Sequence, residues 1–294
     1  MYEDILFPFD GSDGAAEALH HAAEIANWTD GEIRLLYVAD TTEYSTTRVQ
    51  SDVVDGQVEH GEEILETAAE TLDTLAADYA TDVVQGAPAE TIVEYAEQYD
   101  YDVVVMPTQG RRGLSRYLLG SVTEKVVRLC SVPVLTARMN PDDEFAYPYE
   151  RILLATDGSQ SAEHAAMHGL DLASAVDATV HGLSAVETNV LGPDVRSGGV
   201  TTAGQAAAEE AVETIANAAQ RRGIGEVVRH VEEGPPAETV IDVIDREDIE
   251  AVVMGTTGRR GITRILLGSV AEKTVRAAPV PVITVQSPDE TVQA

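Results

Sequence analysis

Short apolar runs alternate along the chain with longer segments in which apolar residues recur at helical spacing. In the first half, the runs Asp4–Phe9, Ile33–Ala39 and Asp102–Met106 predict strands, and Gly14–Trp28 predicts a helix. Pro88 stands where a further helix is expected to begin, because the first helical residue needs no N–H donor. The nearly continuous β-branched residues of the run that ends at Met106 are typical of a parallel sheet covered on both faces.

The rest of the first half continues this alternation. After a polar stretch that begins at Asp40, we expect a helix through Tyr79 and then a short third strand, Asp82–Gln85. A helix, Ser121–Arg128, and a last strand, Val132–Thr136, complete the pattern. Five strands that alternate with four helices predict an α/β fold, a doubly wound, Rossmann-like domain with a five-stranded parallel sheet flanked by helices.

The second half repeats the first. The segment Ile5–Ser12 recurs as Ile152–Ser159, at an offset of 147 residues. The 29 residues that begin at Gly110 match those that begin at Gly258 at about 18 positions, at an offset of 148. We therefore expect two tandem domains of the same fold joined by a proline-containing, acidic linker; the expected ranges are 1–139, 140–149 for the linker, and 150–288.

The charge of the chain excludes several kinds of partner. Asp and Glu total 51 and Lys and Arg total 19, which gives a formal net charge of −32. Such a field repels nucleic-acid backbones and anionic membrane surfaces. Strong acidity with only two lysines predicts a halophilic protein, because molar salt shortens the Debye length to about 3 Å. We expect a cytoplasmic location, since there is no basic secretory signal and no apolar stretch of roughly 20 residues.

Candidate chemistry lies at the expected carboxyl ends of the strands, where doubly wound sheets bind their ligands. Asp10 and Asp157 follow the first strand of each copy. Glycine-rich loops after the fourth strands lead into Gly120-Ser121 and Gly268-Ser269, each at the start of a helix. Phosphate binding by free N–H groups and simple N-capping by the serine are both compatible with this feature.

The placement of the basic residues favours an anion at these loops. Ten of the 19 Lys and Arg residues lie in the windows Thr108–Arg128 and Thr256–Arg276. Pairing of some of these arginines with acids across an interface stays open as an alternative. The ten are Arg111, Arg112, Arg116, Lys125, Arg128, Arg259, Arg260, Arg264, Lys273 and Arg276.

The spacing of the glycines restricts the kinds of ligand that these loops are expected to bind. Neither Gly-x-Gly-x-x-Gly nor the P-loop pattern occurs in these loops. The second copy reads Gly255-Thr-Thr-Gly258, then nine residues, then Gly268-Ser269. This pattern after a valine-rich fourth strand, with an early Asp at the end of the first strand, resembles the universal stress protein family. The resemblance covers nearly the whole chain as two tandem copies.

The resemblance implies that the protein binds ATP, with Mg²⁺ accompanying the nucleotide. Adenine and ribose would lie near Asp157 and Ala185, and the glycine loop would surround the phosphates. The implied residues of the second copy are Ala155, Thr156, Asp157, Ala185, Met254, Gly255, Thr257, Gly258, Arg259, Gly268, Ser269 and Val270. Those of the first copy are Pro8, Phe9, Asp10, Val38, Met106, Gly110, Gly120, Ser121 and Val122.

The first copy departs from the motif at Pro107, which replaces the first glycine. Proline lacks the N–H and has a fixed φ, and we expect its ring beside the nucleotide. The second copy is therefore predicted to be the tighter ATP site. Both copies are expected to pack as a pseudo-twofold pair within the chain, like the dimer of the family, and further homo-oligomers stay open.

The resemblance implies a regulatory or protective module of the stress response. A slow ATPase or self-phosphorylating enzyme, and an interaction protein that binds no nucleotide, are the alternatives; no catalytic residue is predicted. The segments Thr41–Gly56 and Thr188–Gly204 differ most between the copies and are expected to be lids or to contact a protein partner, which the sequence does not name. The histidines have no metal-ligand spacing, and Cys130 is expected to be a small core residue.

Overall fold

The computed structural model describes residues 1–41, 50–108, 119–138, 145–187, 202–225, 227–258 and 267–287. The chain forms two compact units, Met1–Pro148 and Tyr149–Ala294. Each unit holds one of the sequence repeats.

The first unit contains a parallel sheet in the order β3-β2-β1-β4-β5. Its strands are β1 (Asp4–Pro8), β2 (Glu32–Asp40), β3 (Asp78–Gly86), β4 (Val103–Pro107) and β5 (Val134–Ala137). Its helices are α1 (Asp13–Thr29), α2 (Gln50–Leu75), α3 (Pro88–Gln98) and α4 (Ser121–Leu129).

The second unit repeats this arrangement in the order β8-β7-β6-β9-β10, again parallel. Its strands are β6 (Arg151–Ala155), β7 (Thr179–Val186), β8 (Val228–Glu233), β9 (Ala251–Gly255) and β10 (Val282–Val285). Its helices are α5 (Gln160–Val176), α6 (Thr202–Arg221), α7 (Pro236–Arg246) and α8 (Ser269–Ala277).

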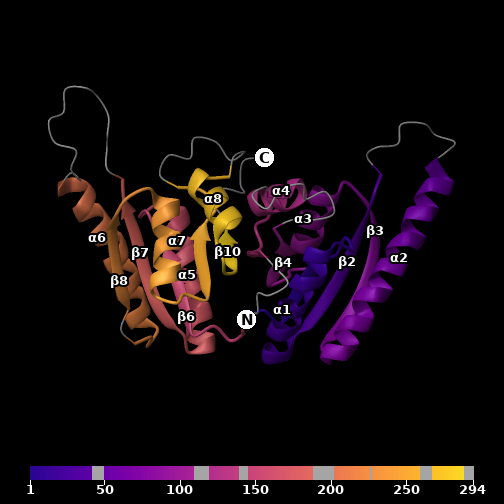
Figure 1. Cartoon of the computed structure of the whole chain (residues 1–294), viewed down its shortest axis with the longest axis horizontal. Coiled ribbons are helices and arrows are strands. Elements are labelled where there is room, and N and C mark those ends of the chain that lie inside the picture. Colours follow the sequence, from indigo (N-terminus) through magenta and orange to yellow (C-terminus); the bar gives the residue numbers. More distant parts are fainter. Residues whose placement is uncertain are drawn as a thin grey trace, which may run out of the picture. The chain divides into compact units, whose positions relative to one another are not determined.

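Helices cover both faces of each sheet (Figure 1). In the first unit α1 and α2 contact each other on one face, while α3 and α4 contact each other on the opposite face. In the second unit α5 and α6 form one layer and α7 and α8 the other. The predicted fold, two tandem doubly wound α/β domains with five parallel strands each, is confirmed.

The central strands are buried on both faces, as their apolar sequences predict. Ile5, Leu6 and Phe7 of β1 have no exposed surface, and neither have Val103–Val105 of β4. Cys130 is also buried, and burial raises the pKa of its thiol to about 12. This environment keeps the thiol protonated and agrees with the prediction of a core residue.

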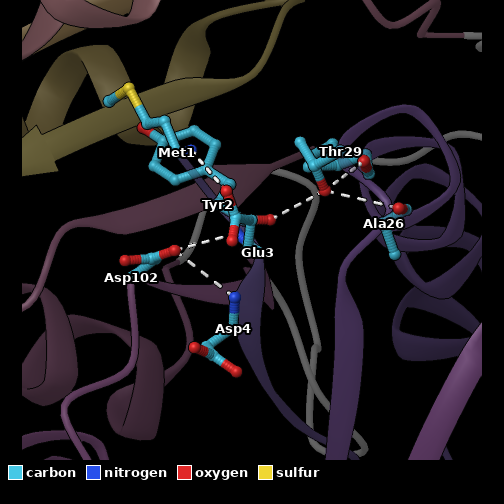
Figure 2. A network of polar contacts seen from close by, with 8 residues as sticks. Met1, Tyr2, Glu3, Asp4, Ala26, Thr29 and Asp102 are labelled. Atoms are coloured by element: carbon cyan, nitrogen blue, oxygen red, sulfur yellow. Dashed lines mark hydrogen bonds and ion pairs between the residues drawn. The ribbon is translucent and has the colours of Figure 1, made fainter.

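A set of polar contacts fixes the amino end of β1 (Figure 2). The Asp102 carboxylate accepts hydrogen bonds from the backbone N–H groups of Glu3 (2.8 Å) and Asp4 (3.3 Å). The Thr29 hydroxyl, at the end of α1, donates to the Tyr2 carbonyl at 3.0 Å. Glu250 takes the place of Asp102 in the second unit, where it accepts from the N–H of Glu150. The same device thus positions the central strand in both units.

The third strand of the first unit is longer than predicted. Ala76 has a φ of 54°, in the left-handed region, and helix α2 ends just before it at Leu75 rather than continuing to Tyr79. Tyr79 instead pairs with Ile33 of β2, so the strand begins at Asp78. Tyr79 and Thr81 are residue types that favour strands, and they lie two positions apart, on one face. Pairing with β2 therefore outweighs the helical spacing of the residues before them.

Two expected connecting regions are only partly described. In the expected linker, residues 139–144 lie outside the described residues, whereas Phe145 and Tyr147 pack on α1. The ring centroids of Phe145 and His21 are 5.8 Å apart, and those of Tyr147 and Trp28 are 5.5 Å apart. Of the two expected lid segments, residues 42–49 and 188–201 lie outside the described residues. No helix in the described part of the chain has the length and apolar character that crossing a membrane requires.

We expect Asp102→Ala to lower the free energy of unfolding of the first unit by about 1 kcal/mol, because two backbone donors lose a charged acceptor that water replaces only in part. Urea denaturation followed by circular dichroism measures this change. Asp4→Ala removes an exposed carboxylate from the same strand end and is the matched control. Equal stability of the two variants would show that the contacts in Figure 2 do not hold the strand.

Candidate functional site

The candidate site lies where the strand order reverses, between β6 and β9 in the second unit. The ladder between these strands runs through four pairs and ends at Ala155–Met254. The equivalent ladder of the first unit, between β1 and β4, has only the pairs Ile5–Val103 and Leu6–Val104. Pro8 and Pro107 lie in the unpaired part and lack an N–H for the ladder. The ladder between the two central strands therefore ends two pairs earlier in the first unit.

The turn that follows β6 is held by its own side chains. The Asp157 Oδ1 atom accepts from the N–H of Ser159 at 2.9 Å, and the Thr156 hydroxyl accepts from the N–H of Gly158 at 3.0 Å. Ser159 then caps α5 by accepting from the N–H of Ala162 at 3.3 Å. The amino end of α5 is thus satisfied within the turn. Asp10 and Ser12 make the equivalent contacts before α1.

The amino end of α8 is arranged differently. The N-cap is Gly268, which has no side chain to offer, and Ser269 is the first helical residue. The N–H of Gly268 donates to the Thr256 carbonyl at 2.8 Å, which ties the two ends of the glycine loop together. In the first unit Gly120 donates to the Thr108 carbonyl at the same distance, 2.8 Å. Capping by the serine, one of the two interpretations of Gly-Ser, is therefore excluded in both units.

The first N–H groups of α8 have no acceptor within the helix, and they lie near the end of β9 because Gly268 is bonded to Thr256. The donors of Ser269, Val270 and Ala271 precede the first helical hydrogen bond, which the N–H of Glu272 makes to the Gly268 carbonyl at 2.9 Å. The N-cap residue, Gly268, has no side chain that could cap them. Such N–H groups, together with the helix dipole, favour an anion.

The glycines of the motif bring backbone close to the site. A Cβ on Gly258 would lie 2.8 Å from Asp157 Oδ2, so the loop approaches this carboxylate only because residue 258 has no side chain. A Cβ on Gly268 would lie 3.0 Å from the Thr256 carbonyl oxygen. The predicted residues Asp157, Gly258 and Gly268 therefore belong to one edge of the second unit.

The position of Gly255 explains the substitution by Pro107 in the first copy. A Cβ on Gly255 would lie 2.8 Å from Ser161 Oγ and 3.0 Å from the Ser161 carbonyl oxygen, in the layer between β9 and α5. The residue equivalent to Ser161 in the first copy is Gly14, which has no side chain. The Cβ direction thus leads toward the helix, whereas we expected the ring of Pro107 beside the nucleotide. The pair Pro107 and Gly14 replaces the pair Gly255 and Ser161.

Two buried hydroxyls near the loop were not predicted. Ser161 Oγ and Thr256 Oγ1 have no hydrogen-bond partner among the described residues, although Ser161 is only 5% exposed and Thr256 only 3%. Thr256 belongs to the recognised motif, but nothing in the sequence distinguishes its hydroxyl from those of neighbouring threonines. A buried hydroxyl without a partner is costly, and that of Thr256, which directly follows β9, is available to a group that enters the site.

The other predicted residues are distributed along the same strand ends. Met254, Thr156, Met106, Pro8 and Phe9 are buried, while Asp157, Asp10, Ala185 and Val38 are half-buried. Ser269 and Ser121 are exposed at the helix starts. Five more of the predicted residues are half-buried at or near the strand and helix ends: Ala155, Thr257, Val270, Gly120 and Val122. Arg259 and Gly110 lie outside the described residues.

Two of the ten basic residues in these windows form ion pairs with carboxylates in the described part of the chain. Lys125 pairs with Glu90 of α3 at 3.3 Å, and Arg276 pairs with Glu272 on its own helix. Six further cations of the two windows, Arg111, Arg112, Arg116, Arg259, Arg260 and Arg264, lie outside the described residues.

Comparison with known proteins identifies the same family in both halves of the chain. The sequence model of the universal stress protein family matches residues 1–138 and again residues 148–286. A universal stress protein of Mycolicibacterium smegmatis is 28% identical over 96% of both chains. Universal stress protein MJ0531 of Methanocaldococcus jannaschii is 35% identical over 47% of this chain and 83% of its own length. The crystal structure of a universal stress protein from Archaeoglobus fulgidus covers 97% of this chain and 99% of that chain, with a TM-score of 0.74 and 22% identity.

We expect Gly255→Ala to destabilise the second unit by about 1–3 kcal/mol, because the new methyl group overlaps α5. Adding Ser161→Gly should restore part of the loss, since it removes the Oγ atom but leaves the backbone contact. Gly225→Ala is the control, because a Cβ there has nothing within 4 Å. Thermal unfolding measures all three variants, and equal melting temperatures for Gly255→Ala and Gly225→Ala would contradict the close packing at this position.

Proposed function

Since the chain belongs to the universal stress protein family, we propose that its second copy binds ATP, with Mg²⁺ on the phosphates, and that the protein acts as a regulatory or protective module. The observation that carries the proposal is the amino end of α8, which has no side-chain cap and is tied to the end of β9 by the hydrogen bond between Gly268 and Thr256.

The phosphates would lie where a capping side chain would lie if the N-cap were not glycine. The N–H groups of Ser269 and Val270 supply donors at the start of the helix, and the dipole of α8 adds positive potential there. The unpartnered Thr256 hydroxyl lies in the same loop. A phosphate at this position would satisfy the first N–H groups of the helix and a hydroxyl that has no hydrogen-bond partner among the described residues.

The nucleoside would lie against the turn after β6. Asp157 is half-buried, and its Oδ1 atom is already used by the turn. Carboxylate oxygens accept hydrogen bonds from ribose hydroxyls, as acidic residues do at other doubly wound sites. Ala185, the second-last residue of β7, leaves room beside this turn because its side chain is small.

The two alternative functions differ from this proposal in measurable ways. An interaction protein that binds no nucleotide would show no saturable ATP binding. A slow ATPase or self-phosphorylating enzyme would bind ATP and then release phosphate or become labelled by the γ-phosphate. Both assays use the same full chain in molar KCl.

We expect Gly268→Asp to abolish most high-affinity ATP binding and Gly120→Asp to abolish little, in isothermal titrations at molar KCl. The carboxylate would repel phosphate from the helix end, while Asp remains a favourable N-cap at the φ of −59° that Gly268 adopts. If Pro107 costs the first copy one hydrogen bond of about 1 kcal/mol, the copies differ in affinity by roughly fivefold.

Gly268→Asn is the matched control for this experiment, because it adds the same Cβ and a capping side chain without the charge. It should retain more ATP affinity than Gly268→Asp. AMP should bind more weakly than ATP to the unsubstituted chain, because it lacks the outer phosphates. Equal losses from the substitutions at Gly268 and Gly120, or the reverse order, would contradict the asymmetry.

We also propose that the protein is adapted to high salt within the cytoplasm. Its net charge of −32 is self-repelling over about 30 Å at 0.01 M salt but over only about 3 Å at 1 M. The melting temperature should rise by roughly 5–10 °C between these concentrations of KCl, as a screening gain of a few kcal/mol implies. Sucrose at equal osmolality is the control. A melting temperature that does not change with KCl would contradict this adaptation.

A further inference from the structure

A cluster of two buried histidines and a half-buried glutamate lies in the second unit, away from the proposed nucleotide site. His181 is the third residue of β7, His230 is the third residue of β8, and Glu247 directly follows α7. All three belong to the amino end of the sheet, whereas Ala185 lies four residues further along β7, about 13 Å away at the usual rise of a strand. The cluster is therefore separate from the strand ends described above.

Strand register and helix packing bring these residues together. Gly182 faces α6, since a Cβ there would lie 3.4 Å from a methyl group of Val212. His181 must then face the opposite side, where α7 packs on β7. Arg229 reaches toward α6 through its ion pair with Glu213 at 3.1 Å, so His230 also faces α7. Glu247 is the residue that directly follows the carboxyl end of that helix.

The geometry of the two rings is compatible with a shared cation. His181 Nδ1 and His230 Nε2 are 3.1 Å apart, and the ring planes differ by only 8°. Two nitrogens bound to zinc at 2.0–2.1 Å with tetrahedral angles would be about 3.3 Å apart. One ring nitrogen of each histidine and one oxygen of Glu247 all lie within 4.8 Å of one another. Only a small movement of Glu247 would bring all three onto one ion.

The surroundings keep the histidines in the form that binds metals. His181 is only 4% exposed and His230 only 7%, and this burial lowers the pKa of both imidazoles. Neutral imidazole with a free nitrogen is the ligand that zinc requires. Arg246 bonds to the Glu247 carboxylate, which holds the pKa of that group below its ordinary value.

The charges around the cluster leave a net negative field. Arg246 donates to Glu247 at 3.0 Å and to Glu232 at 2.7 Å, and its guanidinium is 3.5 Å from His230 Nδ1. Arg151 is paired with Glu250 at 2.8 Å. Two carboxylates, Glu232 and Glu247, thus share the one guanidinium of Arg246. A divalent cation would balance the remaining negative charge and would displace Arg246 from Glu247 toward Glu232.

The first copy provides an internal comparison. The positions equivalent to His181, His230 and Glu247 hold Arg34, Asp82 and Tyr99. Arg34 and Asp82 form an ion pair at 3.1 Å, to which the Tyr95 hydroxyl also donates. The first unit therefore fills this place with an ion pair, although the Nε atom of Arg34 has no partner among the described residues. The second unit fills it with three residues of types that bind transition metals.

We propose that His181, His230 and Glu247 form a site for Zn²⁺ or a similar divalent transition metal. Two imidazoles and one carboxylate are a known zinc ligand set, with a water molecule in the fourth position. The metal would join β7, β8 and the end of α7, so that binding would stabilise the second unit.

The test is a titration of Zn²⁺ into the full chain, stripped of metal by a chelator and kept in molar KCl with excess Mg²⁺ to occupy surface carboxylates. We expect one tight site per chain and a rise in melting temperature with Zn²⁺. Co²⁺ should give the visible absorption of a tetrahedral site. Glu247→Gln should weaken binding at least tenfold, and His181→Arg combined with His230→Asp, which reproduces the pair of the first unit, should abolish it.

Two controls separate this site from other sources of binding. His164→Gln alters an exposed histidine of the same unit and should leave Zn²⁺ affinity unchanged. Gly268→Asp, which disrupts the proposed nucleotide site, should also leave it unchanged. Absence of a one-to-one Zn²⁺ complex would overturn the proposal, and so would equal Zn²⁺ affinity of the unsubstituted chain and Glu247→Gln.

Discussion

Each unit depends on the parallel pairing of its central strand with a neighbour on either side. The central strand is β1 in the first unit and β6 in the second. The helix after β1 or β6 leads to the neighbouring strand on one side, whereas the helix after β4 or β9 leads to a strand on the other side. Two connections therefore leave the same edge of the sheet in opposite directions. Asp157 lies on one of these connections and Gly268 on the other. Their proximity is thus a result of topology, and the missing side chain of Gly258 lets the two connections approach.

Much of the architecture could be predicted from periodicity, because the strands are apolar and the helices have regular spacing. The third strand was predicted too short, since Asp78 to Thr81 continues a helical pattern and only pairing with β2 makes it extended. In the site, the motif identified the glycines, but not the unpartnered hydroxyl of Ser161. The cluster of His181 and His230 was missed because 49 residues separate them and only strand register joins them.

The two copies show how a closely packed fold accommodates change. Where one has Gly255 beside Ser161, the other has Pro107 and Gly14, so a larger residue on the strand accompanies a smaller one on the helix. Where one has an ion pair of Arg34 with Asp82, the other has two histidines. Both are paired replacements at buried or half-buried positions, where a single change would leave a clash or an unpaired group. The units therefore share a scaffold but differ in the groups they offer to ligands.

The central claim is that the uncapped end of α8 holds the phosphates of an adenine nucleotide, and the nucleotide content of the purified protein tests it most directly. Protein isolated in molar KCl is denatured with acid, and the extract is separated and measured by its adenine absorbance. The account predicts close to one adenine nucleotide per chain, mainly ATP, which Gly268→Asp removes and Gly120→Asp largely retains. A chain that carries no adenine nucleotide and takes up none when ATP is added would contradict it.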